Sequence, residues 1–124
     1  MGNLQLSLKK NWFEMTKSGI KTEDYREITP YFGKRFISEF FYFDCFGLDD
    51  RPRLDRINIH LRACPNGFFN KFNTNIMTLG YPKSTDSERI LKLKHKGIEI
   101  REGNPDWGAE AGKLYFVIKH GEIL

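Results

Sequence analysis

Alternation of apolar and polar positions predicts strands near both ends of the chain. Leu4 and Leu6 alternate with polar neighbours over residues 3–7, which is typical of a half-buried strand. The same period of two recurs in the second half, where Gly97 interrupts one alternating segment and allows a bulge. The further strands predicted cover residues 57–61, 72–79, 90–96, 98–100 and 114–119.

Helix signals occur twice in the first third of the chain. Ser7 is placed to cap a helix over residues 9–18, and Gly19 is a natural C-cap because only glycine adopts the left-handed conformation without steric cost. Thr29 followed by Pro30 predicts the start of a second helix. The first helix would offer Trp12, Phe13 and Met15 for packing, and the second would carry Tyr31, Lys34, Arg35 and Glu39.

Residues 36–46 hold five phenylalanines and are compatible with a continued helix or with a buried strand. Loops are predicted over 48–53 and 80–87, with a turn at 65–67. Several short strands with few helices and no regular strand–helix alternation predict an α+β fold. We expect one domain of 124 residues, a mixed and mainly antiparallel β-barrel with one to three helices packed at its ends.

The polar segment after Gly19 is the first candidate site. Lys21 would be delivered to the start of a strand over residues 22–27. That strand has two polar faces, which indicates an edge strand or the wall of a cleft. One face carries Thr22, Asp24 and Arg26, and the other carries Glu23, Tyr25 and Glu27. The alternative is an exposed network of ion pairs that contributes little free energy.

Several motifs along the chain together resemble one known family. The N-terminal motifs are Leu6-Ser7-Leu8-Lys9, Trp12-Phe13, Gly19-x-Lys21-Thr22 and Tyr25-Arg26-Glu27. The C-terminal motifs cover residues 79–83, 97–100, 103–108 and 115–119. This pattern resembles the ASCH domain, a small PUA-like β-barrel, in its phage and bacterial branch. The resemblance spans most of the chain except residues 40–70.

The resemblance implies a nucleotide-related function. In ASCH proteins that resemble small amidohydrolases acting on acetylated cytidine, the lysine of the Gly-x-Lys motif works with a threonine three residues later and a distant glutamate. Lys21 matches that lysine, but Asp24 stands where the threonine is expected, and Thr22 is only one residue from Lys21. A carboxylate is a poor nucleophile toward an amide, and the glutamate has no assigned counterpart. Lys21 and Asp24 are therefore the catalytic candidates of a metal-independent hydrolase, and binding is the favoured interpretation.

Basic and aromatic residues from distant segments form the second candidate site. Aromatic rings stack on bases while lysines meet phosphates, which is the combination that single-stranded nucleic acid requires. The set comprises Lys9, Lys10, Trp12, Lys34, Arg35, Tyr81, Lys83 and Trp107. Trp12 could instead belong to the core, and Trp107 could fill the barrel end. We therefore favour Lys9, Tyr81 and Lys83 over either tryptophan.

Composition narrows the possible partners. A net charge of +4 and an isoelectric point near 9.1 favour polyanions. No segment has the length and hydropathy of a membrane span, and the N-terminus lacks a signal-peptide pattern, so we expect a cytoplasmic protein that does not bind membranes. Neither the three histidines nor Cys45 and Cys64 have the spacing of metal ligands. No cofactor is expected, and both cysteines are predicted to be buried, reduced thiols.

These observations predict a protein that binds RNA or a nucleotide-like small molecule in a basic cleft. The predicted binding residues are Lys9, Lys21, Thr22, Glu23, Tyr25, Arg26, Tyr81, Lys83 and Trp107. Two alternatives stay open. One is a hydrolase acting on a modified nucleoside, as an amidohydrolase, or on RNA, as a ribonuclease. The other is a phage or mobile-element accessory protein that binds a protein partner through exposed phenylalanines.

Overall fold

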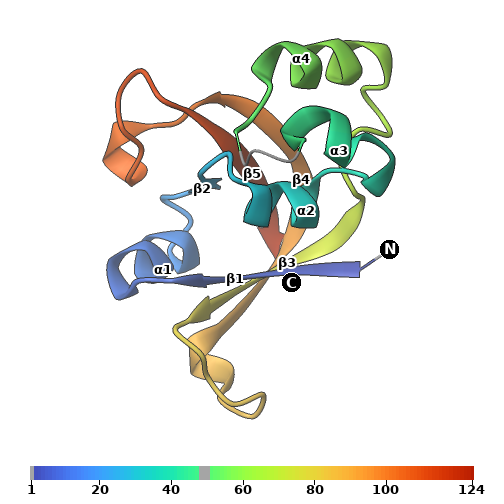
Figure 1. Ribbon diagram of the computed structural model, residues 1–124. Coiled ribbons are helices and arrows are strands. Elements are labelled where there is room, and N and C mark those ends of the chain that lie inside the picture. Colours follow the sequence, from blue (N-terminus) through green and yellow to red (C-terminus); the bar gives the residue numbers. More distant parts are fainter. Residues whose placement is uncertain (1, 48–50) are drawn as a thin grey trace.

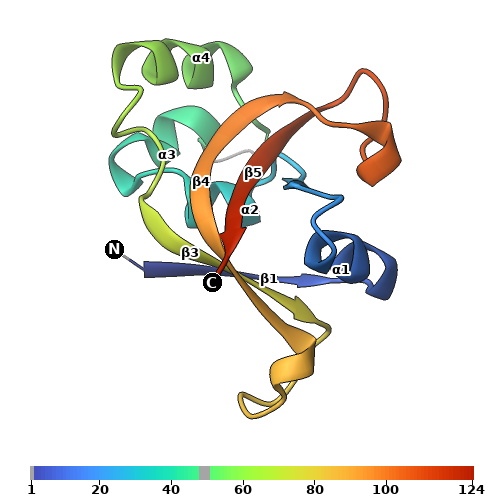
Figure 2. The same cartoon turned by 180° about the vertical axis from the view of Figure 1, so that it is seen from behind.

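The computed structural model, which describes residues 2–47 and 51–124, is built on a curled five-stranded sheet (Figures 1 and 2). The strand order is β1-β3-β4-β5-β2, with β1 parallel to β3 and every other pair antiparallel. The curl makes a half-barrel, so the α+β class and the mainly antiparallel sheet are confirmed. The strands are β1 (Gly2–Leu8), β2 (Glu23–Arg26), β3 (Phe72–Leu79), β4 (Ile90–Glu102) and β5 (Leu114–Ile123).

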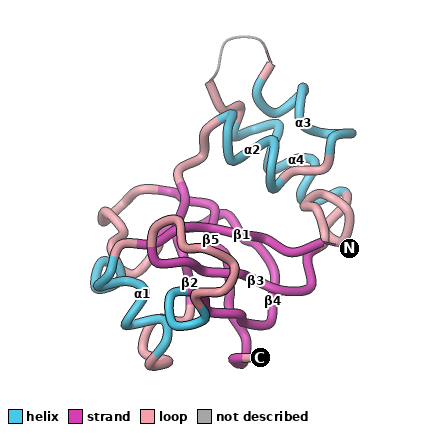
Figure 3. Tube along the Cα trace, turned by 90° about the horizontal axis from the view of Figure 1, so that it is seen from below, coloured by secondary structure: helices cyan, strands magenta, loops and turns pink. Residues whose placement is uncertain are grey.

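Helices cover two separate regions of the sheet (Figures 1 and 3). Helix α1 (Lys10–Lys17) follows β1 and leads to β2, whereas α2 (Pro30–Phe36), α3 (Glu39–Phe46) and α4 (Leu54–Ala63) gather in a group away from α1. Two short 3₁₀ helices, η1 (Ser87–Arg89) and η2 (Pro105–Trp107), flank β4. The described chain thus has four α-helices, more than the one to three expected, and none of them is long and apolar enough to cross a bilayer.

The alternation along β1 explains its place over the core. Leu4, Leu6 and Leu8 are buried while their neighbours are exposed or half-buried. They join one apolar cluster with Phe36 of α2 and Phe116 of β5, whose rings meet edge to face with centroids 5.2 Å apart. Burying large aromatic rings contributes most to such a small core.

Strands β1 and β2 are the two edges of the sheet, and side chains connect them across the opening of the half-barrel. The Arg26 guanidinium on β2 donates a hydrogen bond of 2.8 Å from Nη2 to the carbonyl of Ser7 on β1. Arg35 on α2 likewise donates to the Gln5 carbonyl over 2.6 Å. We call the strip between β1 on one side and β2 with α2 on the other the seam.

Most predicted strands and turns are confirmed. Gly19 has a φ of 84°, and Thr29 caps α2 by accepting a hydrogen bond from the Phe32 N–H. Gly97 has a φ of 112° at a break in the register between β4 and β5, as the bulge requires. The loop prediction over residues 48–53 falls partly outside the described residues, which include only 51–53 of it.

Three local predictions are wrong. Residues 57–61 lie in α4, because Ile57 and Leu61 pack on one helical face at a spacing of four while Ile59 is exposed. Ser7 belongs to β1 and does not cap α1, whose N-cap is Lys9 without a side-chain bond. The phenylalanine run is neither one helix nor a strand, since α2 ends at Phe36 and α3 begins at Glu39.

Candidate functional site

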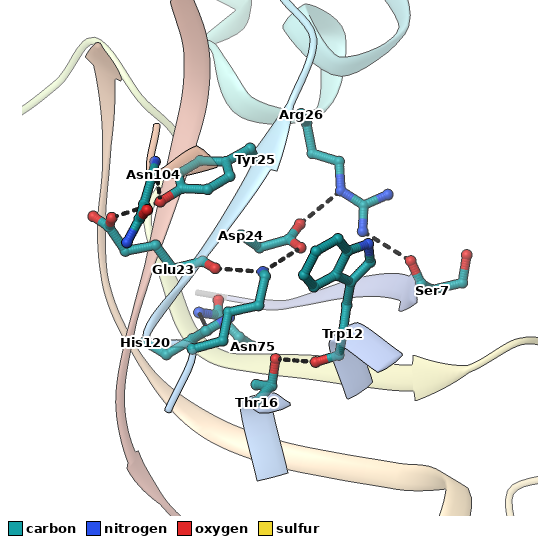
Figure 4. Close-up of polar contacts among 11 residues, drawn as sticks. Ser7, Trp12, Thr16, Glu23, Asp24, Tyr25, Arg26, Asn75, Asn104 and His120 are labelled. Carbon is teal, nitrogen blue, oxygen red and sulfur yellow. Dashed lines mark hydrogen bonds and ion pairs between the residues drawn. The ribbon is translucent and has the colours of Figure 1, made fainter. Parts of the chain in front are cut away.

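Three charged residues meet at the start of β2 (Figure 4). Both carboxylate oxygens of Asp24 accept hydrogen bonds, Oδ1 from Lys21 Nζ at 3.3 Å and Oδ2 from Arg26 Nε at 2.7 Å. Lys21 also donates to the backbone carbonyl of Glu23. Lys21 is 2% exposed and Asp24 4%, so this is a buried ion triad and not the solvated network considered from the sequence.

Local backbone structure fixes Lys21 in this place. Gly19 reverses the chain after α1, and the Lys21 N–H then donates to the Met15 carbonyl over 3.0 Å. Asp24 and Arg26 are two residues apart on β2, so their side chains leave the strand on the same face. A short helix with a glycine end and a strand of period two therefore bring the three charges together.

Burial lowers the pKa of the Lys21 ammonium, and the Asp24 carboxylate opposes that change. A lysine in this environment loses its proton more readily than an exposed one, although its charge is still compensated by Asp24. Both oxygens of Asp24 accept hydrogen bonds from cations, so neither is free to attack a substrate. The arrangement fits the recognition of a ligand better than covalent attack by Asp24.

The triad opens into a cavity of about 240 Å³ at one end of the seam. Lys9 adds a third cation, so three cations face a single carboxylate. The remaining walls are largely aromatic, and they include both tryptophans of the chain. The lining residues are Ser7, Leu8, Lys9, Trp12, Lys21, Asp24, Tyr25, Arg26, Trp107, Gly108 and Tyr115.

Gly108 allows the Trp107 loop to pack closely against the Trp12 ring. Its φ is 99°, and a Cβ atom there would lie 2.9 Å from the Trp12 ring, closer than such contacts occur. The loop containing Trp107 is anchored to β2 through Tyr25, whose hydroxyl accepts from the Asn104 N–H at 3.0 Å and donates to Glu23 at 2.9 Å. Burial raises the pKa of Tyr25 to about 12, with Glu23 adding to the rise and the Asn104 N–H opposing it, so the hydroxyl stays protonated as a donor.

The cavity contains five of the nine predicted binding residues, namely Lys9, Lys21, Tyr25, Arg26 and Trp107. The other four lie elsewhere. Thr22 is exposed and lines no part of the cavity, and the Glu23 carboxylate pairs with Arg101. Tyr81 lines a second cavity of the seam, and Lys83 lines neither.

Several residues at the site were not predicted as part of it. Ser7 and Leu8 are at the cavity because β1 ends there, and Tyr115 enters from β5. Tyr115 carried no signal beyond its place in an apolar strand. Trp12 and Trp107 were ranked below Tyr81 and Lys83 because sequence alone does not distinguish a core ring from one that lines a cavity.

A buried polar network lies behind the triad (Figure 4). Asn75 is fully buried, and its Nδ2 donates to His120 Nδ1 at 2.8 Å while its Oδ1 accepts from His95 Nδ1 at 2.7 Å. His120 Nε2 has no hydrogen-bond partner among the described residues. Burial lowers the pKa of His120 to about 4, which keeps the ring neutral at physiological pH.

The third histidine, His60, and the two cysteines lie outside the cavity. His60 contacts Asp44 at 2.6 Å on the surface of α3 and α4. Both cysteines are free thiols, with Cys45 buried as predicted and Cys64 only half-buried. In the described part of the chain no group of histidine, cysteine and acidic residues is arranged to hold a metal ion.

Comparisons with protein-family models, with curated proteins and with solved structures found no significant match to this chain.

Proposed function

We propose that this protein binds a nucleotide, either free or as part of an RNA strand, in the cavity lined by the Lys21–Asp24–Arg26 triad. The observation that carries the proposal is the juxtaposition of three cations, one neutralised by Asp24, with the rings of Trp12 and Trp107. A phosphate is met by ammonium and guanidinium groups, and a base stacks on aromatic rings. The cavity volume of about 240 Å³ lies below the roughly 300 to 1,000 Å³ of typical small-molecule sites, which disfavours a ligand larger than one nucleotide.

Membership of the ASCH family is part of the same proposal. The Gly19-x-Lys21 motif at the cavity and the curled, mainly antiparallel sheet support a PUA-like barrel. The substitution of Asp24 for the expected hydroxyl, with both its oxygens already bonded, favours binding over hydrolysis.

Calorimetric titration of the protein with nucleoside monophosphates and short RNA tests the proposal. Binding is expected at low salt, and RNA affinity should fall steeply between about 50 and 200 mM salt if several phosphates are contacted. Lys9→Ala should weaken binding by about 1.5 to 3 kcal/mol through loss of a charged hydrogen bond. Lys10→Ala removes the same charge one residue away and outside the cavity, so it should leave affinity almost unchanged. Absence of binding at low salt, or equal effects of the two variants, would refute the cavity as the site.

One observation favours the protein-partner alternative as a second function. Phe40 and Phe43 on α3 are 87% and 65% exposed, and α3 lies away from α1 and its cavity (Figure 3). Exposed phenylalanines of this kind are typical of contact surfaces. The double variant Phe40→Ala/Phe43→Ala should lose binding to a partner protein in a pull-down experiment, while its affinity for nucleotides stays unchanged. A partner retained by this double variant would rule out the α3 surface.

A further inference from the structure

A second cavity continues the seam on the other side of Arg26. Its volume is about 420 Å³, and it shares Ser7 and Arg26 with the first cavity. Both cavities therefore border the last residues of β1, with the Arg26 side chain between them. We call these two adjacent cavities, which share Ser7 and Arg26, the groove.

The second cavity repeats the chemistry of the first. Its cations are Arg26 and Arg35, its rings come from Tyr31, Phe32 and Tyr81, and no carboxylate lines it. Each guanidinium lies over a ring, Arg26 at 5.7 Å from the Phe32 centroid and Arg35 at 5.8 Å from that of Tyr31. Rings and guanidinium planes beside one another offer stacking surfaces for a base together with positive charge.

Arg26 is placed to meet a phosphate between the two cavities. Its Nε donates to Asp24 and its Nη2 to Ser7, whereas Nη1 donates no hydrogen bond to any of the described residues. Figure 4 shows this third nitrogen pointing away from both partners. Because two bonds hold the guanidinium in place, Nη1 presents its donors in a fixed direction.

The free edge of β1 disfavours an extended peptide as the occupant. A peptide strand would add to the sheet by pairing with backbone carbonyls of this edge. The carbonyls of Gln5 and Ser7, two residues apart, already accept from Arg35 and Arg26. A peptide would have to displace both guanidiniums, whereas a polyanion uses them where they stand.

We propose that the seam binds two consecutive nucleotides of single-stranded RNA. One base enters the cavity with Trp12 and Trp107, the connecting phosphate contacts Arg26 Nη1, and the next base lies against Tyr81 in the second cavity. This inference rests on the proposed function and extends it, since it specifies a ligand of at least two linked nucleotides.

Titrations with UMP and AMP, and with the 5′-phosphorylated dinucleotides UpU and ApA, test the inference. Stacking of a second base should make the dinucleotides bind about tenfold tighter than the mononucleotides. Tyr81→Ala should remove that advantage and leave mononucleotide affinity unchanged. Tyr81 is 93% exposed, so the substitution should not disturb folding. Phe40→Ala, which removes an exposed ring outside both cavities, is the matched control.

Each outcome is decisive. Equal affinities for mononucleotides and dinucleotides, or a dinucleotide advantage that survives Tyr81→Ala, would overturn the second subsite while the proposed nucleotide site stands. An oligoglutamate peptide that competes as well as the dinucleotide would also overturn it, because the groove would then recognise charge without bases. If neither mononucleotides nor dinucleotides bind, both the subsite and the proposed function fail.

Discussion

Replacement of Asp24 by asparagine tests whether the buried triad stabilises the fold. The substitution preserves the shape of the side chain but removes the charge that compensates Lys21 and Arg26. The amide of the new side chain retains one acceptor oxygen, so only one of the two cations keeps a hydrogen bond. The second cation then has no carboxylate partner in a site that water barely reaches, since Lys21 is only 2% exposed.

Removing one partner of a buried ion pair costs about 3 to 5 kcal/mol, because the remaining charge stays desolvated. That is a large part of the roughly 5 to 15 kcal/mol by which a domain of this size is stable. Glu99→Gln is the matched control. Glu99 also accepts from two cations, Lys119 and Arg101, both at 2.8 Å, but its side chain is 45% exposed, so its loss should cost about 1 kcal/mol or less.

Urea denaturation of the wild type and both variants measures the two free energies of unfolding. The loss for Asp24→Asn should be several times that for Glu99→Gln. Equal losses would mean that burial does not increase the stability contributed by the triad, which would refute this prediction.

The pH dependence adds a second signature of the same variant. Burial lowers the pKa of Lys21 below 10.5, and without Asp24 it should fall further. Between the lowered pKa and 10.5 the unfolded chain binds a proton that the folded chain has lost, so stability rises with pH in that window. The deficit of Asp24→Asn relative to the wild type should therefore narrow as the pH approaches 10.5. A deficit that is constant with pH would mean that Lys21 is not its source.

The remaining predictions concern acid stability, thiol reactivity and turnover. Because burial lowers the pKa of His120 from 6.5 to about 4, stability should fall by about 3 kcal/mol as the pH drops through this range. Urea midpoints measured against pH should show that His120→Gln flattens this fall. A fall that is unchanged in His120→Gln would contradict the assignment to His120. Burial raises the pKa of Cys45 to about 11, so a thiol reagent should label Cys64 first in the folded protein and both cysteines in urea. Rapid labelling of Cys45 in the folded protein would contradict its burial. Chromatography of acetylated cytidine incubated with the protein should show no deacylation. Turnover abolished by Lys21→Ala, in a variant shown to be folded, would establish the hydrolase instead.

The sequence predicts the sheet better than the helices. Period-two alternation locates β1, β3, β4 and β5, because one face of each strand packs on the core. It fails over residues 57–61, where a five-residue window does not separate a period of two from the spacing of four that places Ile57 and Leu61 on one face of α4. Phe36 and Phe46 are both buried but belong to different helices, and the break at residues 37–38 has no glycine or proline to mark it.

For the site, the sequence predicts the residues near Gly19 but not their environment. The proximity of Lys21, Asp24 and Arg26 can be predicted from two local features, the helix end at Gly19 and the alternation along one strand. The aromatic residues that line the cavity with them, Trp12 and Trp107, lie far apart along the chain. Replacing Lys21 by alanine should lower stability, because Lys21 is buried and its loss removes one of the two cations that pair with Asp24.

The two tryptophans give the most direct test of the central claim. Trp12 and Trp107 are the only tryptophans of the chain, and both line the cavity with the triad. An NMR titration with UMP and AMP that follows the two indole N–H signals, assigned by single Trp→Phe variants, observes the site itself. Both signals should shift with saturation at a common dissociation constant. Nucleotide binding that shifts other resonances and leaves both indole signals in place, or no binding at all, would contradict the account.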